Sequence, residues 1–74
     1  MSRALPVVSG ADTIRALRRA GFERVGQKGD HVKMRHVSPR RTTVVPLHDE
    51  LDIGTLKAIL RQAGLTPAEF RQLL

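Results

Sequence analysis

His31 is the residue of this sequence best placed to do chemistry on a phosphodiester. It follows Lys28 and Gly29, and two further cations, Lys33 and Arg35, come after it at alternate positions. An unperturbed imidazole has a pKa of about 6.5, so it can take or give a proton near neutral pH. The same pattern fits an ordinary histidine on a solvated strand. The neighbouring cations favour the chemical interpretation, because they surround the ring where a phosphate would bind.

The charge of the chain indicates what kind of partner it meets. Its 74 residues carry a formal net charge of +6, which attracts polyanions and speeds their encounter. Asp30 is the only acid in the segment 28–41, and the cations there are Lys28, Lys33, Arg35, Arg40 and Arg41. The two aromatic residues, Phe22 and Phe70, lie at positions typical of a core, so base stacking is not the expected mode of binding. We therefore expect recognition of a nucleic-acid backbone and shape, not of stacked bases.

The other two histidines have structural interpretations. His36 shares the strand face of Val32 and Met34 by strict alternation and lies near a strand end. His48 lies in a loop before a predicted helix, and the acids that follow it are Asp49, Glu50 and Asp52. Acids at a helix start stabilise its dipole and cap it, so we expect no metal site here. Nucleotide-binding glycine loops and paired-carboxylate sites are not recognisable, and no cofactor is expected.

A second phosphate contact is predicted at the start of the helix near residue 54. Gly54 and Thr55 offer backbone N–H groups and a hydroxyl, and Lys57 follows on the same helix. An ordinary solvated helix start explains these residues equally well. Three more arginines, Arg15, Arg18 and Arg19, form either a solvated helix face or an edge of the same basic field.

The elements that must position these side chains are three strands between helices. Apolar spacing predicts a helix over 10–20, which begins after Ser9 and stops at Gly21. Runs of β-type residues separated by turns predict strands over 22–27, 31–37 and 42–46. A second helix follows the cap Asp52 and stops at Gly64, and a capping-box pattern at 66–69 begins a short third helix that runs to residue 74.

This order, α-β-β-β-α-α, predicts a small α+β domain. Tight turns join the strands into a three-stranded antiparallel sheet, and the helices at both ends of the chain should cover one face of it. We expect a single domain over 1–74, with residues 1–8 as a lead-in arm. The chain has no cysteine, which excludes disulfides and a thiol nucleophile. No signal peptide or membrane-binding pattern is recognisable, so a cytoplasmic location is expected.

The chain resembles the HicA-family toxins, also called YcfA-like mRNA interferases. The resemblance covers about residues 9–74 and depends on the order and spacing of several short pieces. These pieces are Ser9-Gly10, Ala20-Gly21-Phe22, the turn region 27–33, the strand end 43–48 and the helix 54–65.

The resemblance implies a fold similar to the double-stranded-RNA-binding domain and a type II toxin that cleaves mRNA. It also implies an acidic HicB-type antitoxin that neutralises this activity. The histidine of a Gly-Ser-His turn carries activity in the family, and it corresponds to His31, with the glycine at Gly29. Asp30 stands where the family usually has serine, and a carboxylate there either orients His31 or repels phosphate.

Two classes of function remain open at this point. One is a metal-independent endoribonuclease in which His31 is catalytic. Its RNA-binding residues would be Lys28, Gly29, Lys33, Arg35, Thr55 and Lys57. The other is a non-catalytic RNA-binding module, which the fold and charge explain equally well. A third and weaker interpretation is a structural subunit that packs its basic face on an acidic protein.

Overall fold

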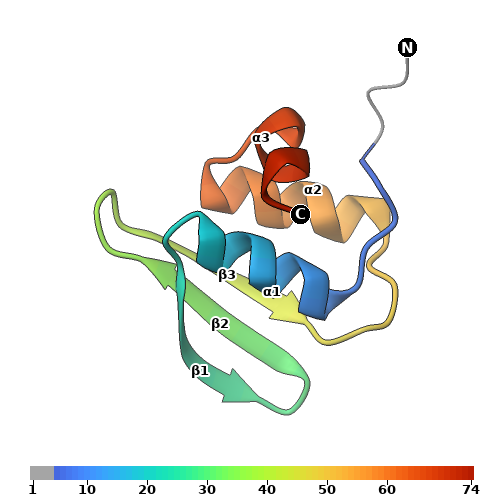
Figure 1. The fold of residues 1–74 in the computed structure, drawn as a ribbon. Helices are drawn as coiled ribbons and strands as arrows, with labels where there is room; N and C mark the ends of the chain where they lie inside the picture. The colour runs from blue at the N-terminus through green and yellow to red at the C-terminus, as the bar shows by residue number, and fades with distance from the viewer. Residues whose placement is uncertain (1–4) are drawn as a thin grey trace.

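The computed structural model describes residues 5–74 as three helices and a three-stranded sheet (Figure 1). The elements are α1 (Gly10–Arg19), β1 (Glu23–Lys28), β2 (His31–His36), β3 (Arg41–Pro46), α2 (Ile53–Ala63) and α3 (Pro67–Leu73). The predicted order and the α+β class are confirmed, with strand and helix ends shifted by about one residue. The similarity to a double-stranded-RNA-binding domain stays a prediction. The first four residues of the predicted arm lie outside the described part, and Leu5 and Val8 of the same arm are buried.

The sheet is antiparallel in the order β1-β2-β3. Val32 pairs with Val45 and Met34 with Thr43, and all four side chains are buried. The intervening pair, Lys33 and Val44, is exposed. The predicted alternation along β2 is therefore confirmed, because side chains point to opposite faces at successive positions.

Strand β1 is paired to the sheet but contributes nothing to the core. All six of its residues are exposed, and it lies at the sheet edge on the side away from α2 and α3 (Figure 1). Its pairing with β2 is irregular between Arg24 and Gly26, where an extra residue forms a bulge. The bulge was not predicted from the sequence. The core lies instead between β2, β3 and the helices, around fully buried residues such as Leu17, Leu56 and Phe70.

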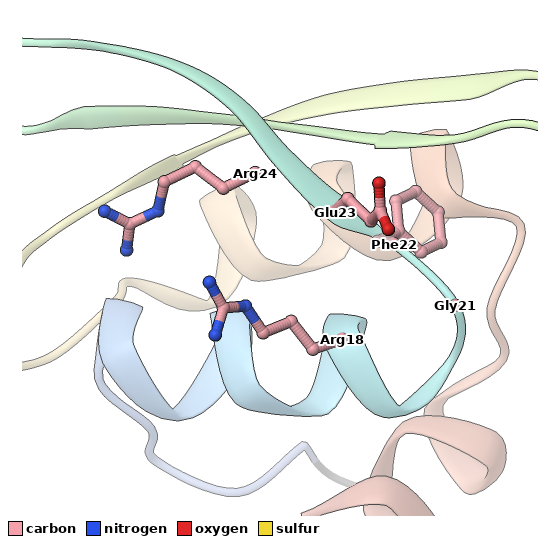
Figure 2. Close-up of a pocket in the computed structure, with 5 residues that line it drawn as sticks. All are labelled: Arg18, Gly21, Phe22, Glu23 and Arg24. Carbon is pink, nitrogen blue, oxygen red and sulfur yellow. The ribbon is translucent and has the colours of Figure 1, made fainter.

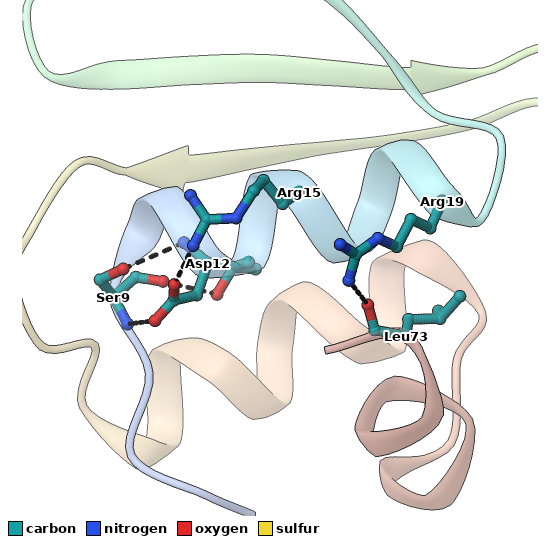
Figure 3. Close-up of polar contacts among 6 residues, drawn as sticks. Ser9, Asp12, Arg15, Arg19 and Leu73 are labelled. Carbon is teal, nitrogen blue, oxygen red and sulfur yellow. Dashed lines mark hydrogen bonds and ion pairs between the residues drawn. The ribbon is translucent and has the colours of Figure 1, made fainter.

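Each helix begins with a side-chain cap that the sequence predicts. The Ser9 hydroxyl accepts the amide of Asp12 at 3.0 Å, and the Asp12 carboxylate accepts the amide of Ser9 at 3.2 Å (Figure 3). Thr66 and Glu69 form the same reciprocal pair at α3. Asp52 caps α2 by accepting the amide of Thr55 at 2.7 Å. These bonds satisfy backbone donors that have no partner within the helix.

The two aspartate caps predict how stability depends on pH. The backbone hydrogen bond from Ser9 lowers the pKa of Asp12, and that from Thr55 lowers the pKa of Asp52. A pKa lowered by folding means that the unfolded chain binds protons more tightly. The stability that the caps supply is therefore complete above about pH 4 and is lost as pH falls through the lowered values.

Urea unfolding between pH 7 and pH 2.5 measures this effect. The double variant Asp12→Asn/Asp52→Asn keeps cap-forming residues but removes the titration. We expect its stability to fall less steeply with acid than that of the wild type. Identical slopes would contradict this assignment.

Candidate functional site

The structure brings three of the predicted site residues around one hollow on the outer face of the sheet. Lys28 from β1 and His31 and Lys33 from β2 line it. Gly26 and Val44 also line the hollow, which has a volume of about 340 Å³. Because Lys28 pairs directly with His31, a phosphate at the imidazole would also meet an ammonium group.

Gly29 shapes the turn that delivers His31 to this position. Its φ of +58° lies in the left-handed region, which glycine adopts without strain. The side-chain amide of Gln27 donates to the Gly29 carbonyl at 3.0 Å and braces the same turn. Gly29 therefore serves the site through its backbone conformation.

The Asp30 carboxylate contacts two histidines. Its Oδ1 lies 3.0 Å from Nδ1 of His31, and its Oδ2 lies 3.4 Å from Nε2 of His48. All three side chains are more than half exposed, so the cluster is open to a large substrate. His48 was predicted to lie in a loop, and its contact with Asp30 was not predicted from the sequence. The antiparallel pairing of β2 with β3 could have predicted the contact. His31 pairs with Pro46, and His48 follows only two residues later, so it lies next to the β1–β2 turn.

Backbone hydrogen bonds fix the loop that carries His48. The amide of Leu47 donates to the Asp30 carbonyl at 2.7 Å, and the amide of Gly10 donates to the His48 carbonyl at 2.9 Å. The β1–β2 turn, the end of β3 and the start of α1 therefore meet at one end of the molecule, as Figure 1 shows. A Cβ at Gly10 would lie 2.0 Å from the Pro46 carbonyl oxygen, so this junction has no room for a side chain.

The basic segment 28–41 does not form one patch, and this corrects a simple extrapolation from the sequence. Arg41 pairs with His36, at the end of β2 opposite to His31. Its guanidinium packs against the end of α2, where a Cβ at Gly64 would lie 2.6 Å from Arg41 Cζ. Arg40 precedes it in the same distant turn. Antiparallel strands carry residues apart by about 3.4 Å per position, which separates these two arginines from the hollow.

Arg35 and His36 are the last two residues of β2, at the end opposite to His31. Arg35 is half-buried opposite Glu23 and Thr42, and its Nε is buried without a hydrogen-bond partner among the described residues. His36 packs against Phe22 with ring centroids 5.2 Å apart, and its Nδ1 lies 2.9 Å from the Pro39 carbonyl oxygen. The predicted structural role of His36 agrees with these contacts.

Thr55 and Lys57 lie on α2, beyond the loop that carries His48. The Thr55 amide donates to Asp52 Oδ1, and its hydroxyl donates to Asp52 Oδ2 at 3.0 Å. The carboxylate therefore already occupies the position that a phosphate would take at this helix start. Lys57 is exposed. The contribution of both residues to RNA binding stays a prediction.

The three arginines of α1 have three different surroundings. Arg15 forms an ion pair with Asp12, and Arg19 donates to the Leu73 carbonyl at 2.7 Å, which ties α1 to α3 (Figure 3). Arg18 instead faces Arg24 of β1 across a separate hollow of about 460 Å³ (Figure 2). Within residues 5–74 neither Arg18 nor Arg24 forms an ion pair. Glu23 lines the same hollow, and Arg24 donates to the side-chain oxygen of Gln27 at 3.1 Å.

The described histidines and acids include no group of three or more arranged to hold a metal ion. None of the described helices is long and apolar enough to cross a membrane.

Comparison with known proteins identifies the class of this chain. Residues 10–65 match the family described as HicA toxin of bacterial toxin-antitoxin. The match covers more than half of the chain and spans α1 to the end of α2, including the turn with His31 and the loop with His48. No curated protein matches the chain.

The chain belongs to the HicA toxin family and is a toxin of a toxin–antitoxin system. The resemblance drawn from the sequence is thereby confirmed. Membership also implies a cognate antitoxin as partner.

The crowded junction at Gly10 generates a stability prediction. Gly10→Ala places a methyl group against a backbone carbonyl, and relieving the overlap should cost about 1–3 kcal/mol of unfolding free energy. Gly54→Ala is the matched control. It is also a glycine in the first turn of a helix, but its Cβ would meet only Asp52 Oδ1 at 3.4 Å. Chemical denaturation should show loss for the first variant and none for the second, and equal stability would contradict the assignment.

Proposed function

We propose that this toxin is a metal-independent endoribonuclease that cleaves mRNA in the cytoplasm, with His31 as its catalytic residue. The observation that carries the proposal is the position of the ring. His31 Nδ1 is 3.0 Å from the Asp30 carboxylate, and the imidazole lines a hollow with Lys28 and Lys33. A ring nitrogen that donates to a carboxylate leaves the other nitrogen with its lone pair, ready to accept a proton.

The chemistry that fits this arrangement is attack by the neighbouring RNA hydroxyl. His31 Nε2 takes the proton of a 2′-OH, and the 2′-oxygen attacks the adjacent phosphorus. The bond from phosphorus to the 5′-oxygen breaks, which leaves a 2′,3′-cyclic phosphate and a free 5′-hydroxyl. The ammonium groups of Lys28 and Lys33 stabilise the charge that gathers on the phosphate oxygens.

Binding of the RNA backbone would extend beyond the hollow. Arg35 lies two residues beyond Lys33 on β2, and Lys57 lies on α2. Arg18 and Arg24, which line the second hollow, would offer a further phosphate contact on the other side of β1. Such a spread of cations suits recognition of a backbone, which carries no sequence information by itself.

The test of this proposal is cleavage of a defined RNA by the purified protein and by His31→Ala. We expect cleavage by the wild type to persist in EDTA and to yield cyclic-phosphate or 3′-phosphate ends. The variant should lose about 10²–10⁴-fold in rate, the usual contribution of a general acid or base.

RNA binding by His31→Ala should remain mostly intact, because many cations contribute to the binding free energy and one imidazole contributes little of it. His36→Ala tests whether the loss of any histidine abolishes cleavage, and we expect this variant to cleave RNA as the wild type does. A non-catalytic RNA-binding module would bind RNA but leave it uncut, and full toxicity of His31→Ala in cells would refute the assignment.

The antitoxin is proposed to be an acidic protein of the HicB type that covers the face of His31, Lys33 and Arg35. Complementary carboxylates on a partner would attract this basic surface and accelerate association. Covering the hollow blocks RNA and buries His31 in one step, so the toxin need not change its fold.

Hydrogen exchange of the complex measures this arrangement. We expect protection of residues 28–36, and association that slows with added salt, since exposed charges are screened beyond about 8 Å at physiological ionic strength. Protection confined to α1 and α2 would instead show that the antitoxin acts from the helical side.

A further inference from the structure

The Asp30 carboxylate joins His31 to a second imidazole that the reaction described above leaves without a role. His48 Nε2 lies 3.4 Å from Asp30 Oδ2, while His31 Nδ1 lies 3.0 Å from Oδ1 of the same carboxylate. Each ring contacts a different oxygen of the same carboxylate, so Asp30 holds the two imidazoles near one another. Each ring directs one nitrogen to Asp30, so each keeps its other nitrogen for a substrate.

The reaction itself requires a second proton-transfer group. When the bond from phosphorus to the 5′-oxygen breaks, the departing oxygen takes both bonding electrons and needs a proton. His31 cannot supply it at that moment, because its role is to remove the 2′-OH proton. A protonated imidazole on the other side of the phosphorus would meet this requirement.

The two rings have different neighbours beyond the shared carboxylate. Lys28 of β1 and Lys33 of β2 line the hollow with His31. His48 has Asp30 on the β1–β2 turn and Asp52 at the start of α2. Hydrogen bonds from Thr55 lower the pKa of Asp52 most, and the positive charge of His48 lowers it further. From α1, the neutral amide of Gly10 donates to the His48 carbonyl.

We infer that His48 is the general acid of the cleavage reaction and that Asp30 is a positioning residue that orients both histidines. This inference rests on the proposed RNA cleavage. His48 Nδ1–H protonates the 5′-oxygen as the bond to phosphorus breaks, and His31 Nε2 holds the proton of the former 2′-OH. In hydrolysis of the cyclic phosphate the roles reverse. Neutral His48 takes a proton from water, the water oxygen bonds to phosphorus, and His31 returns its proton to the departing 2′-oxygen.

A substrate with sulfur in place of the bridging 5′-oxygen tests the assignment, because a thiolate leaves without protonation. His48→Ala should cleave ordinary RNA about 10²–10⁴-fold more slowly than wild type, and should cleave the 5′-sulfur RNA at close to the wild-type rate. His31→Ala should be slow on both substrates. Glu50→Ala is the matched control, since Glu50 is an exposed acid of the same loop, and it should match wild type on both.

Asp30→Ser and Asp30→Asn test the positioning role. Each variant removes the carboxylate that both rings contact, so we expect kcat to fall while KM changes little, because the reaction is affected and RNA binding is not. A merely structural role would weaken RNA binding as well as cleavage.

The outcomes separate the inference from the proposed function. If the wild type leaves both RNAs intact, the cleavage proposal fails and the inference with it. If the wild type cleaves RNA but His48→Ala matches it on ordinary RNA, or is equally slow on both substrates, only the role of His48 is overturned. Circular dichroism and RNA binding of each variant confirm that the fold is retained.

Discussion

The hydrogen bond from the Gly10 amide to the His48 carbonyl is the contact on which the arrangement of the candidate site depends. It joins the start of α1 to the segment after β3, at a point where a side chain on residue 10 would meet the Pro46 carbonyl. The Leu47 amide joins the same segment to Asp30, and the Leu51 amide joins it to Val8. The cluster of Asp30, His31 and His48 is exposed, so burial does not hold these side chains in place. Backbone hydrogen bonds fix the segments that carry these residues, and the contacts with the Asp30 carboxylate join the side chains.

Most of the fold follows from patterns that act over a few residues. The alternation of Val32 and Met34 with Lys33 fixes the inner face of β2, and the caps at Ser9, Asp52 and Thr66 fix where the helices begin. Such signals depend on one strand or one turn of helix, so they can be recognised without knowing the rest of the structure. The bulge in β1 could not be predicted in this way. It depends on how two strands pair, and β1 has no buried face to fix its register.

The site was predictable only where its members are close in the sequence. Lys28, His31 and Lys33 lie within six positions and on one side of a hairpin, and they line the same hollow. His48 comes from another loop, and its place beside Asp30 is set by the pairing of β2 with β3. Sequence proximity also misplaced Arg41, which the sheet carries to the opposite end of the molecule. Thr55 lies at the predicted helix start, but the carboxylate of Asp52, three residues earlier, accepts its hydrogen bonds.

The exposure of β1 on both of its faces has a consequence for how the family can diverge. Substitutions at exposed positions usually change stability by less than about 0.5 kcal/mol, so β1 can vary in charge and shape while the core stays the same. The strand borders both hollows, because Arg24 lines one and Lys28 the other. Selection can therefore change the surface of this one strand, at both hollows, separately from selection on folding.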